Sequence, residues 1–152
     1  MAGLGSRTVG KAYDAVTTEH VQLRALRDEI AALLAARPDR RWRKTLAARL
    51  QELSGRLAGH FALEEKAGLF EDLEEALPEA GRECARLRAD HPWLLAHLED
   101  LRDRLRAPEP KGGSEAIEAS LRTFLEELAR HEERENALLT RAAEDDELGA
   151  VD

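Results

Sequence analysis

The chain has 152 residues, enough for one domain with its own core, and its single cysteine excludes an internal disulfide framework. Lys and Arg number 23 against 31 Asp and Glu, a net charge of −8, so no nucleic-acid partner held through its phosphates is expected. The longest stretch without a charged residue is 8 residues, 91–98, too short to span a membrane, and we expect a soluble, cytoplasmic protein.

The apolar composition favours helices. Ala and Leu number 26 and 25, whereas the β-branched residues Val and Ile together number only 6. Ala and Leu are strong helix formers, and β-branched residues are the ones that strands use. The composition therefore predicts an all-α fold.

Apolar residues recur every three or four positions, the helical period, in four long segments. The first segment runs from about Val9 to Ala36 and ends before Pro38, which a helix does not comfortably continue through. The second starts near Asp39, a suitable N-cap, and continues to about Glu75. The inward stripes of these two segments are Val16, Leu23, Ile30 and Leu34, then Leu46, Leu50, Leu53 and Leu57.

The third segment covers about Glu79–Arg106, and the fourth opens after the Pro- and Gly-containing connector 107–113 with Ser114 as its N-cap. Pro92 falls inside the third segment, where it removes a helix hydrogen bond. Either the helix kinks there, or one helix ends near Ala89 and another begins with Pro92 in its first turn. The inward stripes of these two segments are Leu87, Leu94, Leu98, Leu101 and Leu105, then Ile117, Leu121, Phe124, Leu128 and Leu138.

Short connectors make successive helices antiparallel, so the predicted architecture is an up-down-up-down antiparallel four-helix bundle. We expect the bundle to occupy residues 9–142. Glycines in residues 1–8 predict a flexible N-terminus, and the acidic residues of 143–152 predict a flexible, solvated tail.

Four of the five histidines follow one rule. Two pairs of histidines are each separated by 40 residues, and a Glu follows the second member of each pair after four residues: His20, His60 and Glu64, then His91, His131 and Glu135. A shift of 71 residues relates the two sets, and the inward apolar stripes share that shift. The chain therefore looks like a duplicated helical hairpin.

These histidines and glutamates point into the bundle. His60 and Glu64 prolong the apolar stripe of the second segment, and the matching pair prolongs that of the fourth. Residues four apart share one face of a helix, so both members of each pair face inward. His20 and His91 also lie on inward stripes. Four imidazoles and two carboxylates are thus expected at one level of the interior.

Such a cluster requires a compensating charge. Each ionised carboxylate buried without a partner costs several kcal/mol, and the stripes carry no Lys or Arg at that level. Either the carboxylates are protonated or a cation lies between them. A lone His on an apolar face is usually a core residue satisfied by hydrogen bonds, but the repeated His–Glu spacing favours a site for two metal ions. Imidazole and carboxylate ligands suit iron, with manganese and zinc as rivals.

With these residues the chain resembles the hemerythrin-like family, which carries the His-His-Glu cation-binding domain. The resemblance covers about residues 9–142 and rests on His20, the string HFALEE at 60–65, His91, and HEERE at 131–135. It implies a non-haem di-iron centre, oxo- or hydroxo-bridged, inside the bundle. By position it implies that one iron is held by His20 and His60, the other by His91 and His131, and that Glu64 and Glu135 bridge them.

The chain departs from the oxygen-carrying members of that family. They have a second His one turn after the third-helix His, where this chain has Leu95, and an Asp five residues after the fourth-helix His, where this chain has Glu135 after four. His97 does not replace the missing ligand, because it lies about 120° around the helix from His91. The pattern is closer to the sensor-type and bacterial members.

The departures bear on function. With two imidazoles, two Glu oxygens and a bridging oxygen, each iron keeps one open position. The resemblance then implies binding of dioxygen, peroxide or nitric oxide as a small ligand, with catalase-like decomposition of hydrogen peroxide favoured over reversible oxygen carriage. The alternative is a non-enzymatic module that senses oxygen, iron or nitric oxide or simply binds iron. Both a monomer and a dimer are compatible with the sequence.

Further residues adjoin the predicted ligands. Phe61, Trp93 and Phe124 are expected to pack around the metals and limit water entry. Glu65 and Glu132 stand next to ligands in the sequence, and either contact them or face solvent. Tyr13 lies two turns before the first ligand histidine, where it either contacts a ligand or is one more buried stripe residue.

Overall fold

The structure is a computed structural model that describes residues 2–36, 41–108 and 113–150, with side chains for 14–36, 41–108 and 115–145. Within these ranges the chain is helical and contains no strand. Its elements are the α-helices α1 (Ala2–Ala35), α2 (Trp42–Lys66), α3 (Leu69–Ala76), α4 (Gly81–Arg106) and α5 (Gly113–Ala150), and the 3₁₀ helix η1 (Pro78–Ala80). The predicted all-α fold is confirmed.

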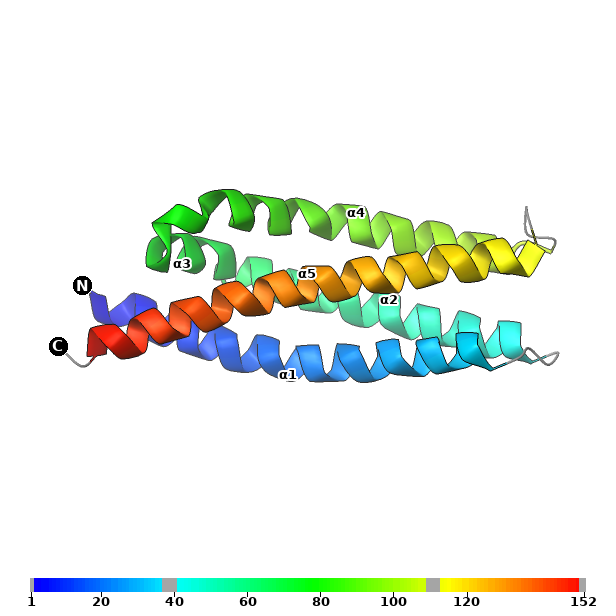
Figure 1. The fold of residues 1–152 in the computed structure, drawn as a ribbon, viewed down its shortest axis with the longest axis horizontal. Helices are drawn as coiled ribbons and strands as arrows, with labels where there is room; N and C mark the ends of the chain where they lie inside the picture. Colours follow the sequence, from blue (N-terminus) through cyan, green and yellow to red (C-terminus); the bar gives the residue numbers. More distant parts are fainter. Residues whose placement is uncertain (1, 37–40, 109–112, 151–152) are drawn as a thin grey trace.

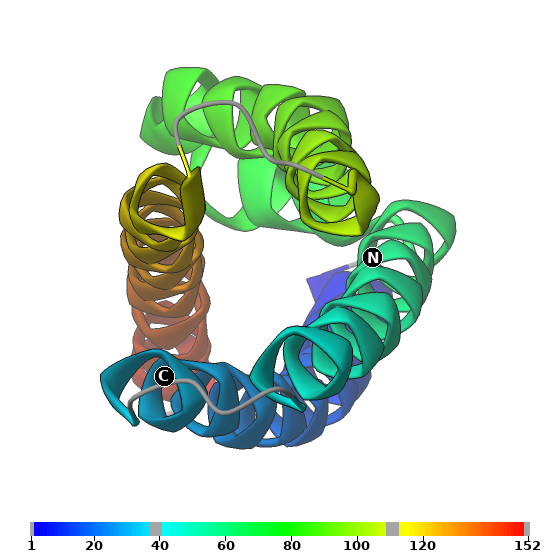
Figure 2. The ribbon, with the colours of Figure 1, turned by 90° about the vertical axis from the view of Figure 1, so that its right-hand side faces the viewer.

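The four long helices form an antiparallel bundle (Figure 1). Helix α1 packs against α2 and α5, and α4 packs against the same two helices, so the four surround a common axis (Figure 2). The start of α1, the end of α5 and the short helix α3 all lie at one end of the bundle. The up-down-up-down bundle predicted from the connectors is therefore confirmed, with α3 as an addition.

The predicted inward stripes are buried and form two separate apolar cores. The larger core fills the end of the bundle away from α3, and the smaller core lies around α3. On α1, Val16 belongs to the smaller core and Leu23 to the larger; on α4 the same holds for Leu87 and Leu94. The residues between these pairs therefore form a layer that separates the cores, and this layer contains the predicted ligands.

The second predicted helix is two helices. It was expected to run to about Glu75, but α2 ends at Lys66 and α3 begins at Leu69. Gly68 has a φ of 69°, the left-handed conformation that ends many helices, and its N–H donates to the Glu65 carbonyl oxygen. The apolar spacing of the sequence continues through this turn, since Leu69 and Phe70 follow it directly and are both buried. Periodicity alone therefore did not indicate the break.

Pro92 does not end a helix. Helix α4 continues through it from Gly81 to Arg106, so the alternative in which a helix ends near Ala89 is wrong. The proline is exposed on the outer face of the bundle. Water can therefore hydrogen-bond the carbonyl that loses its helix partner, which lowers the cost of an interior proline.

The helix ends differ from the predicted ones. Helix α1 begins at Ala2 and α5 continues to Ala150, so helical backbone extends into both segments that were expected to flank the bundle; their flexibility stays a prediction. Helix α5 starts one residue before Ser114, whose side chain is outside the described residues. The predicted cap Asp39 also lies outside them, and α2 begins at Trp42. In the described part of the chain, no helix combines the length and apolar character needed to cross a membrane.

The left-handed turn gives a test of the helix break. A Gly68→Ala variant should lose about 1 kcal/mol of unfolding free energy, because an L-residue at positive φ is strained although space for its Cβ exists. Gly55→Ala is the matched control: that glycine is exposed inside α2 with nothing near its Cβ, and alanine there should add about 0.5 to 1 kcal/mol. Urea unfolding of the metal-free proteins measures both. Equal effects of the two substitutions would contradict the assigned turn.

Candidate metal centre

The layer between the two apolar cores contains all six predicted ligands. Each of the four long helices contributes at least one: His20 from α1, His60 and Glu64 from α2, His91 from α4, and His131 and Glu135 from α5. None of the six is more than 3% exposed. The helical period that buries the leucine stripes therefore buries these polar side chains as well. The structure brings the predicted set together, and its role in metal binding stays a prediction.

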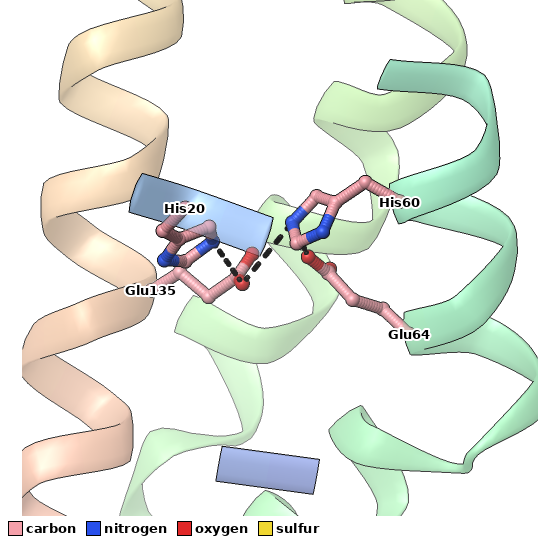
Figure 3. Close-up of side chains that lie close together, drawn as sticks. All are labelled: His20, His60, Glu64 and Glu135. Atoms are coloured by element: carbon pink, nitrogen blue, oxygen red, sulfur yellow. Dashed lines mark ion pairs between the residues drawn. The ribbon is translucent and has the colours of Figure 1, made fainter. Parts of the chain in front are cut away.

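The first group consists of His20, His60, Glu64 and Glu135 (Figure 3). Each offers one ligand atom, and these atoms lie within 4.8 Å of one another. Nε2 of His20 lies 3.1 Å from Oε1 of Glu135, and Nε2 of His60 lies 4.0 Å from the same oxygen. Nε2 of His60 also forms a close ion pair with Oε1 of Glu64. Two imidazoles and two carboxylate oxygens thus face one point.

The second group consists of His91, His131 and Glu135, whose ligand atoms also lie within 4.8 Å of one another. Nε2 of His131 is 3.4 Å from Oε2 of Glu135, and Nε2 of His91 is 3.3 Å from Oε2 of Glu64. Each carboxylate therefore directs Oε1 toward the first histidine pair and Oε2 toward the second. This is the arrangement that a bridging carboxylate requires.

Most of these atoms have no hydrogen bond, although they lie at ion-pair distance from one another. The buried atoms without a hydrogen-bond partner include Nε2 of His20, His91 and His131 and all four carboxylate oxygens of Glu64 and Glu135. Buried polar groups are normally hydrogen-bonded, and an unpaired buried carboxylate is costly. A cation between them would satisfy every one of these atoms. The donor set of imidazole nitrogen and carboxylate oxygen suits iron, and also manganese or zinc.

The two buried carboxyl groups have opposite pKa shifts. Burial raises the pKa of Glu64 to about 8, against the lowering effect of His91, and the charge of Glu135 adds to the rise. Burial also opposes ionisation of Glu135, but the neighbouring His131 and His20 outweigh it and lower its pKa. Burial lowers the pKa of His60 to about 4. In the metal-free protein one carboxyl group thus retains a proton at neutral pH, which an incoming cation must displace.

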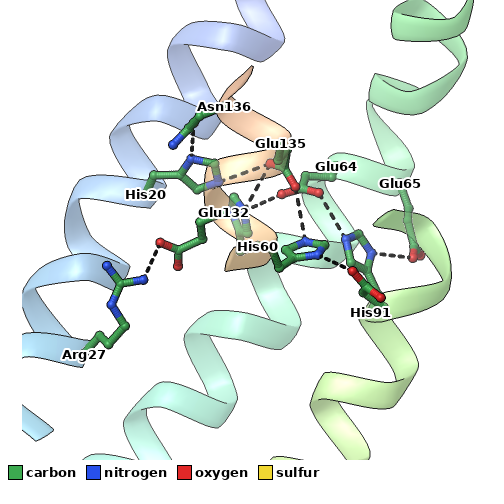
Figure 4. Close-up of polar contacts among 11 residues, drawn as sticks. His20, Arg27, His60, Glu64, Glu65, His91, Glu132, Glu135 and Asn136 are labelled. Atoms are coloured by element: carbon green, nitrogen blue, oxygen red, sulfur yellow. Dashed lines mark hydrogen bonds and ion pairs between the residues drawn. The ribbon is translucent and has the colours of Figure 1, made fainter. Parts of the chain in front are cut away.

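The outer nitrogens of three histidines are held by polar side chains, and Figure 4 labels the contacts of His20 and His91. Nδ1 of His20 lies 2.8 Å from Oδ1 of Asn136, Nδ1 of His91 lies 3.1 Å from Oε1 of Glu65, and Nδ1 of His131 lies 3.0 Å from Oδ2 of Asp90. An Nδ1–H that donates outward leaves Nε2 as the unprotonated nitrogen facing the centre. Nδ1 of His60 is buried and has no hydrogen-bond partner.

Two of these orienting residues were missed by the sequence analysis. Asp90 and Asn136 were not singled out, whereas Glu65 was expected either to contact a ligand or to face solvent. Glu65 does both: it contacts His91 and its side chain is 52% exposed. The 71-residue shift that relates the ligands also relates Glu65 to Asn136, so the repeat could have indicated Asn136.

Glu132 is buried and forms an ion pair with Arg27 rather than a hydrogen bond with a ligand histidine. Its Oε2 accepts a hydrogen bond of 2.9 Å from Nη1 of Arg27, while its Oε1 has no partner. Burial raises the pKa of Glu132, against the lowering effect of Arg27. The sequence analysis offered ligand contact or exposure to solvent for Glu132, and neither describes it. Its partner, Arg27, comes from the neighbouring helix α1.

Aromatic rings close one side of the centre. The ring of Phe61 stacks on His91 at a centroid distance of 3.8 Å and an interplanar angle of 7°, and Phe70 lies 5.4 Å from the same imidazole. Phe61 thus packs against a predicted ligand, and its role in limiting water entry stays a prediction. The expectation for Trp93 is wrong, because its side chain is on the surface and 53% exposed. Phe124 is buried in the larger core and contacts His97 rather than a predicted ligand. The side chain of Tyr13 lies outside the described residues.

No further imidazole joins the two groups among the described residues. Leu95, at the position of the additional histidine in oxygen carriers, is partly buried and packs against the larger core. His97 instead contacts the rings of Trp93 and Phe124 and pairs with Glu127 at 3.5 Å. It lies beside the bundle core, as its position on the helix predicted.

Comparison with known proteins gives one match. The family model described as the hemerythrin HHE cation binding domain matches residues 11–143, which contain all six clustered residues. No curated protein and no solved structure matches the chain.

The buried ion pair yields a second prediction. Arg27→Met keeps the apolar stem but leaves Glu132 buried without its cation, and should cost about 3 kcal/mol of unfolding free energy in the metal-free protein. The loss should be larger at pH 8 than at pH 5, because a protonated Glu132 has no charge to bury. Arg49→Met is the control: its ion pairs with Glu29 and Glu52 are exposed and contribute about 0.5 kcal/mol or less. Denaturant unfolding at the two pH values measures the difference, and equal losses in both variants would refute the assigned pair.

Proposed function

The chain belongs to the hemerythrin HHE cation-binding domain family, and on this premise we propose that it holds two iron ions and reacts with dioxygen or its reduced forms, decomposing hydrogen peroxide. The observation that carries the proposal is the division of each buried carboxylate between two histidine pairs. Glu64 and Glu135 each direct one oxygen to either pair, which suits two ions better than one.

The proposed ligand assignment follows from these distances. His20 and His60 would hold one ion and His91 and His131 the other, and Glu64 and Glu135 would each offer one oxygen to either ion. Ring nitrogens and carboxylate oxygens in this layer are buried and have no hydrogen-bond partner. They support the assignment because a bound cation would serve as that partner. Two divalent ions also offset the charge of both carboxylates, so neither needs to retain a proton.

The surrounding residues favour reaction with small oxygen species. Two iron ions held by the four histidines and two glutamates would supply the redox chemistry of this reaction, in which two peroxides give two waters and one dioxygen. Phe61 and Phe70 cover the His91 side and limit the entry of bulk water. Leu95 offers no donor atom, so this chain supplies fewer ligands than an oxygen carrier and leaves room for a small ligand.

Metal loading tests the assignment. The protein incubated anaerobically with Fe(II) should bind two ions per chain, and Glu135→Gln should fall below this number because it removes a carboxylate shared by both ions. Glu133→Gln is the matched control, on the same helix but exposed, and should bind two. At a free metal concentration of about 1,000 times Kd, binding should add about 4 kcal/mol of stability, seen as a rise in Tm. Elemental analysis and thermal unfolding measure both effects, and a Glu135→Gln protein with two tightly bound ions would contradict the assignment.

Peroxide turnover tests the activity. The iron-loaded protein mixed with hydrogen peroxide should release one dioxygen for every two peroxides consumed, measured with an oxygen electrode. The zinc-loaded protein is the control, because zinc has no redox chemistry, and it should release none. A fully iron-loaded protein that leaves peroxide unchanged would reject the enzymatic proposal.

A sensor remains the second candidate because the ligand layer separates two apolar cores. Removal of the ions leaves buried ligand atoms without hydrogen-bond partners where all four long helices meet, so the packing of the helices should respond to metal occupancy. An iron-loaded protein that is inactive with peroxide, but loses helix content or changes between monomer and dimer on chelation, supports this candidate.

A further inference from the structure

The internal repeat extends from the ligands to the residues that hold them. A shift of 71 residues relates His20 to His91 and His60 to His131. The same shift relates two further positions, with Glu65 corresponding to Asn136 and Glu19 corresponding to Asp90. The side chains around the two halves of the centre can therefore be compared position by position.

The first pair of equivalent contacts differs in charge. Nδ1 of His91 lies 3.1 Å from a carboxylate oxygen of Glu65, and Nδ1 of His20 lies 2.8 Å from the amide oxygen of Asn136. The geometry is alike, since in each case a ring from the first helix of one hairpin contacts the second helix of the other hairpin. One acceptor is an anion, and its counterpart is a neutral amide.

At the second pair of equivalent positions, Asp90 and Glu19, only one residue contacts a ligand histidine. Nδ1 of His131 lies 3.0 Å from Oδ2 of Asp90. The equivalent partner of His60 would be Glu19, which is only partly buried, and Nδ1 of His60 has no hydrogen bond. The negative charges of Glu19 and Glu132 lie near His60, but neither accepts a hydrogen bond from its Nδ1, and Glu132 is paired with Arg27.

A carboxylate that accepts the Nδ1–H of an imidazole orients the ring and makes Nε2 a stronger donor to a metal. Both rings of the His91 and His131 pair have such a partner, whereas the His20 and His60 pair has one amide and one free nitrogen. We propose that the two metal positions are unequal, an inference that rests on the proposed two-ion function. The His91 and His131 position binds the first ion, and Glu65 and Asp90 are the positioning residues that make it the tighter one.

Calorimetric titration of the metal-free protein with Co(II), which avoids oxidation, tests this order. Two binding steps should appear, with affinities that differ by about tenfold or more. His131→Ala should remove the tight step, and His60→Ala should remove the weak one. Glu65→Gln should weaken the tight step by about tenfold and leave the weak step almost unchanged. Glutamine keeps an amide oxygen as acceptor, so a purely structural role of Glu65 would leave both affinities unchanged.

An exchange variant tests the same assignment from the other side. The double substitution Glu65→Asn and Asn136→Glu should bring the two affinities close together, because the ring of His20 then gains a carboxylate partner while Asp90 still supports His131. Circular dichroism controls for folding of every variant. Two equal steps in the unaltered protein overturn the inequality, and unequal steps that Glu65→Gln does not change overturn the role of Glu65. Either result leaves the two-ion function intact. Failure to bind two ions at all rejects the proposed function instead.

Discussion

The structure depends on two carboxylates that face each other in the interior of a helical bundle. In the described part of the chain, neither Glu64 nor Glu135 pairs with a lysine or an arginine, and histidines are their charged or polar neighbours. In the metal-free state the two have opposite pKa shifts, because burial dominates at Glu64 whereas His131 and His20 stabilise the charged form of Glu135. A bound cation would make this layer a link among the four long helices, so metal binding and folding stability form one coupled equilibrium.

The apolar parts of the molecule fix the position of this layer. Val16 and Leu87 belong to the smaller core, and Leu23 and Leu94 to the larger, so the histidine between each pair is fixed from both sides. Rotation of any long helix would move leucines toward water together with the ligand. The geometry of the polar centre is therefore set mainly by hydrophobic burial, and the Nδ1 contacts then select which ring nitrogen faces inward.

Periodicity predicted the bundle, the inward stripes and the six clustered residues, because residues four apart must share a helix face. It did not predict the turn at Gly68, since Leu69 and Phe70 keep the apolar spacing while the backbone changes direction. It left Pro92 open, because the cost of an interior proline depends on whether the affected carbonyl faces solvent. The contacts of Asp90 and Asn136 depend on the rotation of neighbouring helices, which one helix's pattern does not contain.

The repeat explains why the centre needs both hairpins. The first group of ligand atoms takes three residues from the first hairpin and Glu135 from the second, and His20 is oriented by Asn136 of the second. A separate hairpin would complete such a centre only by associating with another copy, which costs translational and rotational freedom. Covalent connection makes the association intramolecular. It also frees equivalent positions to differ, so that a carboxylate at Glu65 and an amide at Asn136 can give two similar ligand sets different properties, which two identical hairpins in a symmetric dimer could not have.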